Sequence, residues 1–177
     1  MKLKGTQTEK NLMAAFAGES QARMKYDYFA KEAKKEGYEQ ISAIFAETAL
    51  NEKEHAKRFA KFLGMIDKTP ANLEAAAAGE RYEWTEMYKE FEAKAREEGF
   101  NEIADVFREI GEVEEFHEER SLKLLARVKD GTVFKRDTVV KWHCINCGYV
   151  HEGKEAPKVC PACAHPRAFY QVLPENY

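Results

Sequence analysis

Hydrophobic positions recur at helical spacing over most of the first 130 residues of this 177-residue chain. Steps of three and four residues keep such positions on one helix face. One such stripe consists of Ile41, Phe45, Thr48, Glu52, His55, Phe59 and Phe62. A second consists of Ile103, Phe107, Ile110, Glu114, His117, Ser121, Leu124 and Val128. Each is apolar at both ends and carries Glu-x-x-His in the middle, and a buried carboxylate needs a compensating positive charge. A metal ion is the simplest candidate.

Capping motifs and glycines divide this region into four predicted helices of roughly 25 to 30 residues, the lengths of a four-helix bundle. Thr6 and Glu9 form a capping box at the start of the first helix. Thr69-Pro70 is typical of the start of the third. Glycines typical of helix ends stand at positions 37, 64, 99 and 131. We therefore expect an all-α four-helix bundle of the ferritin-like class over residues 1–135.

The predicted helices form two similar halves, each a helical hairpin. Gly18-Glu19 matches Gly79-Glu80 at an offset of 61 residues, and Glu52-x-x-His55 matches Glu114-x-x-His117 at 62. One residue is therefore inserted in the second half. The matched candidate ligands are Glu19, Glu52, His55, Glu80, Glu114 and His117. Four Glu and two His are the ligand set of carboxylate-bridged two-metal sites in helical bundles, and they suit iron or manganese. A lone Glu-x-x-His is usually a solvated pair; the interior stripe and the duplication argue for a metal.

One position breaks the symmetry of the repeat. Glu83 lies one helical turn after Glu80, whereas Ala22 occupies the matching place after Glu19. Most such glutamates are surface residues, but Glu83 falls on the same stripe as Glu80. A fifth carboxylate would matter more beside two ferric ions than beside two ferrous ions, because the ferric pair carries more positive charge.

All four cysteines lie in the tail, residues 136–177. They form two Cys-x-x-Cys pairs, Cys144 with Cys147 and Cys160 with Cys163. This spacing is typical of a tetrahedral thiolate site for one iron or zinc ion, which staples a domain too small to hold a core alone. Disulfides are the alternative, but no signal peptide is recognisable and we expect a cytoplasmic protein, where they are rare. We expect an aromatic core of Trp142, Tyr149, Phe169 and Tyr170, and surface positions for His143, His151 and His165.

Charge and hydropathy exclude two classes of partner. The net charge is −3, from 28 basic and 31 acidic residues, with no basic stripe for nucleic acid. No apolar run approaches the length of a membrane span.

Taken together, the motifs resemble the rubrerythrin family over essentially the whole chain. They are Ala17-Gly18-Glu19-Ser20-Gln21-Ala22, Glu52-x-x-His55, Gly79-Glu80-x-x-Glu83, Glu114-x-x-His117, and the two cysteine pairs of a rubredoxin-like module. The resemblance implies a di-iron peroxidase that reduces hydrogen peroxide to water in oxidative-stress protection. Its electrons would come from NAD(P)H through a separate reductase or rubredoxin and pass through the four-cysteine iron, although spacing alone leaves zinc possible there. Ala164 stands where free-standing rubredoxins usually have glycine.

The resemblance also implies roles for individual residues. Glu52 and Glu114 would bridge the irons. Glu19, with Glu83 in the ferric state or His55 in the ferrous state, would complete one iron. Glu80 and His117 would complete the other. Tyr26 and Tyr88 match tyrosines that form hydrogen bonds near the site.

Three other functions compete with this reading. An iron-oxidising storage protein would need a cage, in which the tail would be an obstacle. A manganese catalase would leave the four-cysteine module idle. A zinc-ribbon adaptor would use the tail to recruit a partner.

The link between the second and third predicted helices, from Gly64 to Thr69, is short for an intrachain bundle. If these helices run parallel, the link must cover roughly 30 Å for Glu52 and Glu80 to lie at the same height along the bundle. Six extended residues reach only about 20 Å. We therefore expect a domain-swapped homodimer; an antiparallel turn is the alternative.

Overall fold

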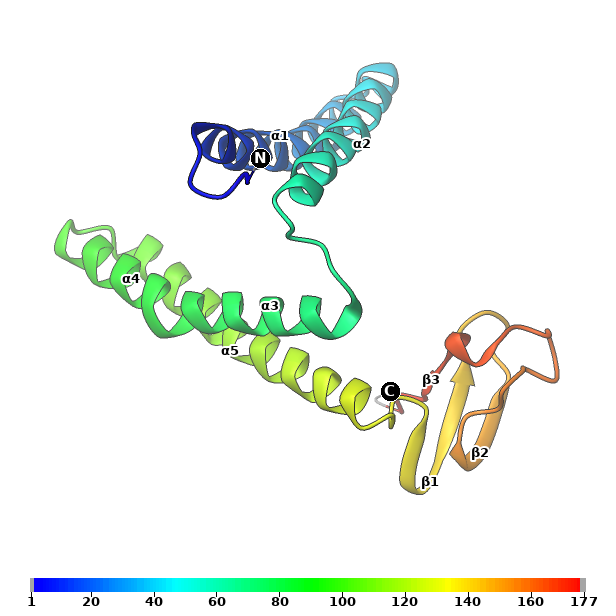
Figure 1. The fold of residues 1–177 in the computed structure, drawn as a ribbon. Helices are drawn as coiled ribbons and strands as arrows, with labels where there is room; N and C mark the ends of the chain where they lie inside the picture. The colour runs from blue at the N-terminus through cyan, green and yellow to red at the C-terminus, as the bar shows by residue number, and fades with distance from the viewer. Residues whose placement is uncertain (1, 176–177) are drawn as a thin grey trace. The chain divides into compact units, whose positions relative to one another are not determined.

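The computed structural model describes residues 2–175 (Figure 1). Its first unit is a hairpin of α1 (Gln7–Lys35) and α2 (Glu39–Phe62), which lie side by side. In the second unit, α3 (Thr69–Tyr82), η1 (Glu83–Met87) and α4 (Tyr88–Glu97) follow one another without a break. All three pack on α5 (Asn101–Lys129). The contacts within the chain divide it into two units, with the boundary after Lys68.

The helix ends lie where the capping signals predict them. The Thr6 hydroxyl accepts a hydrogen bond from the backbone N–H of Glu9 at 3.1 Å, and the Glu9 carboxylate accepts one from the N–H of Gly5 at 2.6 Å. Gly37 and Gly99 end the first helix of each hairpin with φ of +87° and +85°, a left-handed conformation that glycine adopts without a steric penalty.

The two hairpins repeat each other down to their aromatic packing. In the first, Tyr26, Phe29 and Phe45 form a cluster with ring centroids 5.6–6.1 Å apart. In the second, the matching Tyr88, Phe91 and Phe107 lie 5.6–6.4 Å apart. The duplication that the sequence predicts is therefore present in three dimensions.

The residue inserted in the second half lies in a π-helical turn. Glu80 matches Glu19 at an offset of 61, whereas Tyr88 matches Tyr26 at 62, so the extra residue falls between Glu80 and Tyr88. The structure places η1 in this interval, while α1 is α-helical throughout. A π turn holds one residue more than an α turn, and such turns are frequent at functional sites.

The tail is a small antiparallel sheet in the order β2-β1-β3. Its strands are β1 (Lys135–Cys144), β2 (Val150–Glu155) and β3 (Tyr170–Val172), the last preceded by the short helix η2 (Arg167–Phe169). The fold class predicted from the sequence, long helices followed by a small β domain, is confirmed.

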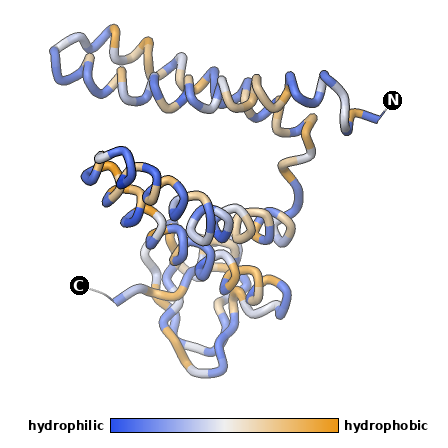
Figure 2. The backbone as a smooth tube through the Cα atoms, turned by 90° about the vertical axis from the view of Figure 1, so that its left-hand side faces the viewer, coloured by the Kyte–Doolittle hydropathy of each residue, from blue (hydrophilic) through white to orange (hydrophobic). Residues whose placement is uncertain are grey.

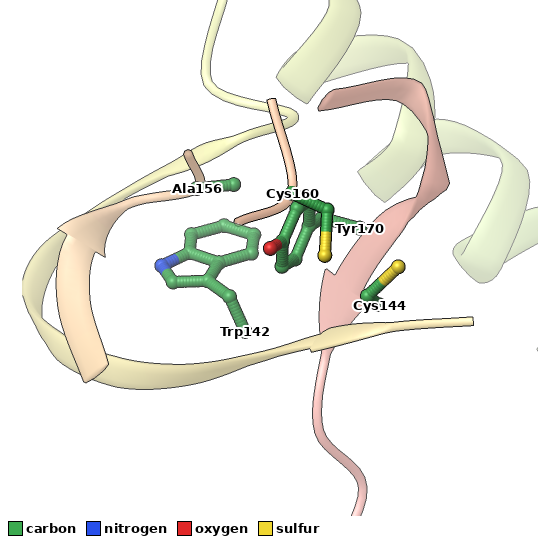
Figure 3. Close-up of a cluster of buried hydrophobic side chains, with 5 residues drawn as sticks. All are labelled: Trp142, Cys144, Ala156, Cys160 and Tyr170. Atoms are coloured by element: carbon green, nitrogen blue, oxygen red, sulfur yellow. The ribbon is translucent and has the colours of Figure 1, made fainter. Parts of the chain in front are cut away.

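The core of the tail is built around one tryptophan (Figure 3). Trp142 is fully buried and donates a hydrogen bond from Nε1 to the carbonyl of Gly153 at 3.0 Å. Tyr170 is also buried, and Phe169 packs against the cluster. The expectation for Tyr149 was wrong: its side chain is 36% exposed, because it follows the turn at Gly148 and lies outside the cluster.

Hydrophobic residues are distributed along the helices of both hairpins (Figure 2). Ile41 and Ile44 on α2 are about half exposed, as are Ile103 and Val106 on α5. Across residues 2–175, none of the helices is both long and apolar enough to cross a membrane.

Candidate metal centres

The first hairpin brings together one predicted ligand group. Glu19 from α1 and Glu52 and His55 from α2 have ligand atoms within 4.8 Å of one another. His55 Nδ1 lies 2.9 Å from Glu52 Oε2 and 3.9 Å from Glu19 Oε1. Residues three apart on a helix share a face, so the Glu-x-x-His spacing produces the first contact, and packing of α1 on α2 supplies Glu19.

The second hairpin repeats this arrangement with Glu80 from α3 and Glu114 and His117 from α5. His117 Nδ1 lies 2.6 Å from Glu114 Oε2 and 3.9 Å from Glu80 Oε2. Each hairpin thus presents two carboxylates and one imidazole, the ligand chemistry that suits one iron of a di-iron centre.

Within each group the two carboxylates are close enough to compete for a proton. The pKa of Glu19 is raised, first by its hydrogen bond with Glu52 and then by burial, while the pKa of Glu52 is lowered by the same hydrogen bond. The pKa of Glu80 is raised by burial and by a hydrogen bond with Glu114. Adjacent carboxylates share a proton when no cation lies between them. A divalent metal can replace that proton, so both groups fit metal binding.

Glu83 lies close to the second group without joining it. It is half-buried in η1, and its charge contributes to raising the pKa values of Glu80 and Tyr88. The tight cluster, however, contains only Glu80, Glu114 and His117 among the described residues. Burial is the main reason that the pKa of Tyr88 is raised, so this phenol keeps its proton. Tyr26 stacks on Phe45.

The four cysteines form a rubredoxin-like metal site. The sulfurs of Cys144 and Cys163 are 3.8 Å apart, and those of Cys147 and Cys160 are 3.7 Å apart. Ligands held about 2.3 Å from a central metal at tetrahedral angles are about 3.8 Å from one another. These separations fit four thiolates around one ion. All four cysteines are free, as the metal-site interpretation expects and the disulfide alternative does not.

The two cysteine turns are related by the same backbone pattern. The N–H of Gly148 donates to the carbonyl of Cys144 at 2.8 Å, and that of Ala164 donates to the carbonyl of Cys160 at 2.9 Å. Gly148 has φ of +83° and Ala164 has φ of +58°. Ala164 is the one non-glycine residue with positive φ in residues 2–175, so the turn is kept although its glycine is replaced.

Backbone N–H groups surround the sulfurs and favour their ionised form. A hydrogen bond from the N–H of His165 is the main cause that lowers the pKa of Cys163 to about 6. A hydrogen bond from the N–H of Tyr149 acts in the same sense on Cys147, but the neighbouring cysteines and burial raise its pKa to about 12. Without a metal the neighbouring thiols therefore compete for protons, and a metal ion bound between them would hold all four as thiolates.

Two residues of this site were not identified from the sequence. The Tyr170 hydroxyl is buried beside Cys160 without a conventional hydrogen-bond partner within residues 2–175, and it contributes to lowering the pKa of Cys160 (Figure 3). His165 was expected to be an unpaired surface residue. Instead its Nδ1 lies 3.1 Å from the carbonyl oxygen of Cys163, and its ring packs on Phe169 at 4.6 Å. The positions of both rings depend on the fold of the cysteine turns, which spacing does not reveal.

Comparison with known proteins identifies the family to which the two parts of the chain are similar. The Rubrerythrin family model matches residues 10–125, and a model described as the rubredoxin-like domain of rubrerythrin matches residues 142–171. A rubrerythrin of Porphyromonas gingivalis is 56% identical, over 99% of this chain and 94% of that protein. A rubrerythrin of Nitratidesulfovibrio vulgaris is 55% identical, over 99% and 98%. A solved structure of nigerythrin in a partially reduced state is 33% identical over 97% of this chain and 89% of that one, with a TM-score of 0.38.

Proposed function

Since the chain belongs to the rubrerythrin family of di-iron oxidative-stress proteins, we propose that it is a peroxidase. Hydrogen peroxide, two protons and two electrons give two molecules of water. The electrons come from NAD(P)H through a separate reductase or rubredoxin, and they enter the protein at the four-cysteine site.

One observation supports this proposal above the others: one chain holds two carboxylate–imidazole groups and a tetrahedral thiolate site. Loaded with iron, the two carboxylate–imidazole groups would supply the pair of electrons needed to cleave the O–O bond, and the thiolate site would supply single electrons to restore them. Neither iron storage nor a manganese catalase needs the four cysteines. An adaptor needs neither carboxylate group.

We assign the ligand roles according to the family resemblance. Glu52 and Glu114 would be the ligands shared by the two metals, Glu80 and His117 would hold one of them, and Glu19 with His55 or Glu83 would hold the other. In each group the imidazole Nδ1 lies 2.6–3.9 Å from the oxygens of both carboxylates, which is consistent with these roles. Tyr88 keeps its proton next to these carboxylates, so its hydroxyl is available to donate a hydrogen bond to a peroxide oxygen.

We further propose that each centre is shared by two chains in a domain-swapped homodimer. Glu52 lies about 15 Å from the end of α2 and Glu80 about 16 Å from the start of α3, at 1.5 Å per residue. In a ferritin-like arrangement α2 and α3 run parallel. The six residues 63–68 reach about 20 Å, which is too short to bring Glu52 and Glu80 of one chain to the same height along the bundle axis. The half-exposed apolar residues on both hairpins indicate that each hairpin has a partner.

The division into a bundle domain, residues 1–135, and a rubredoxin-like domain, residues 136–177, remains part of this proposal, as does a cytoplasmic location.

The function is tested by a visible spectrum during an anaerobic cycle. The protein is reduced fully, and separate samples are mixed with peroxide and with oxygen. We expect the thiolate–iron colour to bleach on reduction and to return faster with peroxide. A faster return with oxygen, or iron retained as mineral, would favour iron oxidation instead. A tail that stays colourless in protein made with iron available would remove the electron-relay part of the proposal.

A further inference from the structure

Glu118 is a buried carboxylate outside both ligand groups. It is the one charged residue among residues 2–175 that is buried, with 7% of its surface exposed. Its Oε2 accepts a hydrogen bond from Trp84 Nε1 at 2.6 Å, and its Oε1 lies 3.4 Å from the guanidinium of Arg81. The Arg81 side chain is 68% exposed, so the tryptophan is the stronger contact. A buried carboxylate is a poor source of stability, which suggests that this one has a specific role.

The partner of Glu118 lies in the π turn. Trp84 directly follows Glu83 in η1, which has no counterpart in the first hairpin. A π turn interrupts the regular hydrogen bonding of a helix, and it is kept only where the surrounding structure holds it. Among the contacts of η1 with α5, the Trp84–Glu118 hydrogen bond is the shortest polar one described.

Helix α5 differs from α2 at the two positions that face this segment. At an offset of 62 residues, Glu118 matches the buried Ala56, and Gly111 matches the buried Ala49. A Cβ added at Gly111 would lie 3.3 Å from Cβ of Tyr88, the residue that follows η1. So α5 offers an acceptor at one end of the π turn and space for Tyr88 at the other.

From this juxtaposition we infer that Glu118 is a positioning residue that acts on Glu83 through Trp84. By holding the indole, it fixes the π turn in the form that presents the Glu83 carboxylate beside Glu80. The inference rests on the proposed function, in which Glu83 is a ligand of one metal. It explains why a buried charge lies in the half of the repeat that has the extra carboxylate and is absent from the half that has Ala22.

Three substitutions separate the hydrogen bond from the charge. Glu118→Gln keeps an acceptor for Trp84 Nε1, Glu118→Leu removes it, and Trp84→Phe removes the donor. Glu119→Leu on the same helix is the matched control, because it removes an exposed carboxylate whose ion pair within residues 2–175 is with Lys123.

The first readout is amide hydrogen exchange in the metal-loaded full-length protein. In Glu118→Leu we expect exchange at residues 83–88 to be at least about tenfold faster than in the natural protein, because the anchored turn opens locally. Glu118→Gln and Glu119→Leu should leave this exchange unchanged. None of the four variants should change exchange at the matching residues 22–26 of the first hairpin. Unchanged exchange in both Glu118→Leu and Trp84→Phe would overturn the inference, so one variant that fails to fold does not decide it.

The second readout is a double-mutant cycle on peroxide turnover. We expect Glu118→Leu to slow turnover in the natural background and to add nothing once Glu83 is replaced by alanine. An equal slowing in both backgrounds would overturn the inference, since Glu118 would then act on another group. If Glu83→Ala turns over peroxide as fast as the unsubstituted protein, both the proposed role of Glu83 and this inference are overturned. A slow Glu83→Ala enzyme with unchanged exchange in Glu118→Leu would overturn this inference alone.

Discussion

At the scale of single residues, Glu83 is distinguished by having no counterpart in the first hairpin. It is half-buried next to Glu80 but outside the tight ligand group. We expect Glu83→Ala to keep the iron content of the protein and to slow turnover with peroxide by about tenfold or more, equivalent to about 1.4 kcal/mol of barrier. Steady-state kinetics and metal analysis check this, with the exposed Glu86→Ala in the same turn as control. Equal rates for the two variants would show that Glu83 takes no part.

Ala164 has a backbone conformation that favours glycine. Its φ of +58° matches the φ of +83° at Gly148 in the other cysteine turn. A left-handed conformation costs a residue with a side chain about 1 kcal/mol or more. We therefore expect Ala164→Gly to stabilise the tail by up to about 1 kcal/mol and Gly148→Ala to destabilise it by a similar amount, measured by denaturant unfolding of the loaded protein. Opposite signs would mean that contacts of the methyl group outweigh the strain.

Tyr170 places a hydroxyl next to the sulfur of Cys160. A hydrogen bond to a thiolate favours the more negative, reduced form of a thiolate–iron site and raises its reduction potential. A neutral hydrogen bond contributes about 0.5–1.5 kcal/mol, so Tyr170→Phe should lower the potential by on the order of 20–60 mV. Redox titration of the visible absorbance measures this directly. A potential that stays the same would show that the hydroxyl does not turn toward the sulfur in the loaded site.

At the scale of elements, α5 approaches the start of α4, directly after the π turn, most closely at Gly111. Replacing glycine by alanine inside a helix normally stabilises it by about 1 kcal/mol. At Gly111 the new Cβ would lie 3.3 Å from Cβ of Tyr88, and overpacking costs about 1–3 kcal/mol. We expect Gly111→Ala to be destabilising by about 1 kcal/mol in urea unfolding, whereas Gly18→Ala, where a Cβ meets nothing within 4 Å, should be stabilising. If both changes stabilise the protein, Tyr88 can move without penalty.

At the scale of the whole molecule, the proposed exchange of hairpins predicts complementation between two inactive chains. One chain carries Glu19→Ala and Glu52→Ala, and the other carries Glu80→Ala and Glu114→Ala. In a swapped heterodimer one of the two sites combines both intact halves, so co-expression should restore about a quarter of the natural activity. Intrachain sites would restore none. A monomer that sediments with two bundle irons would also contradict the swap.

Much of this protein follows from local sequence. The capping box at Thr6 and the glycines after the helices set the helix ends, because those residues satisfy or terminate backbone hydrogen bonds within a few positions. The Glu-x-x-His pair of each ligand group is also local in origin, because this spacing places two ligands on one helix face. The spacing of the four cysteines predicts that their sulfurs lie together, since a domain this small has few other ways to be stabilised.

Other features were decided by tertiary packing. The repeat in the sequence revealed one inserted residue. The structure showed that this residue is accommodated in a π turn, in which Trp84 donates a hydrogen bond to Glu118 on α5. Likewise, Tyr149 lies outside the core and His165 lies inside the cysteine turns, since both positions depend on the path of the chain around the four sulfurs. Sequence alone determined which groups can bind metal, because ligand chemistry and helical spacing are local. The positions of Glu83, Glu118 and Tyr170 relative to those groups depend on how separate elements pack, so only the tertiary structure decided them.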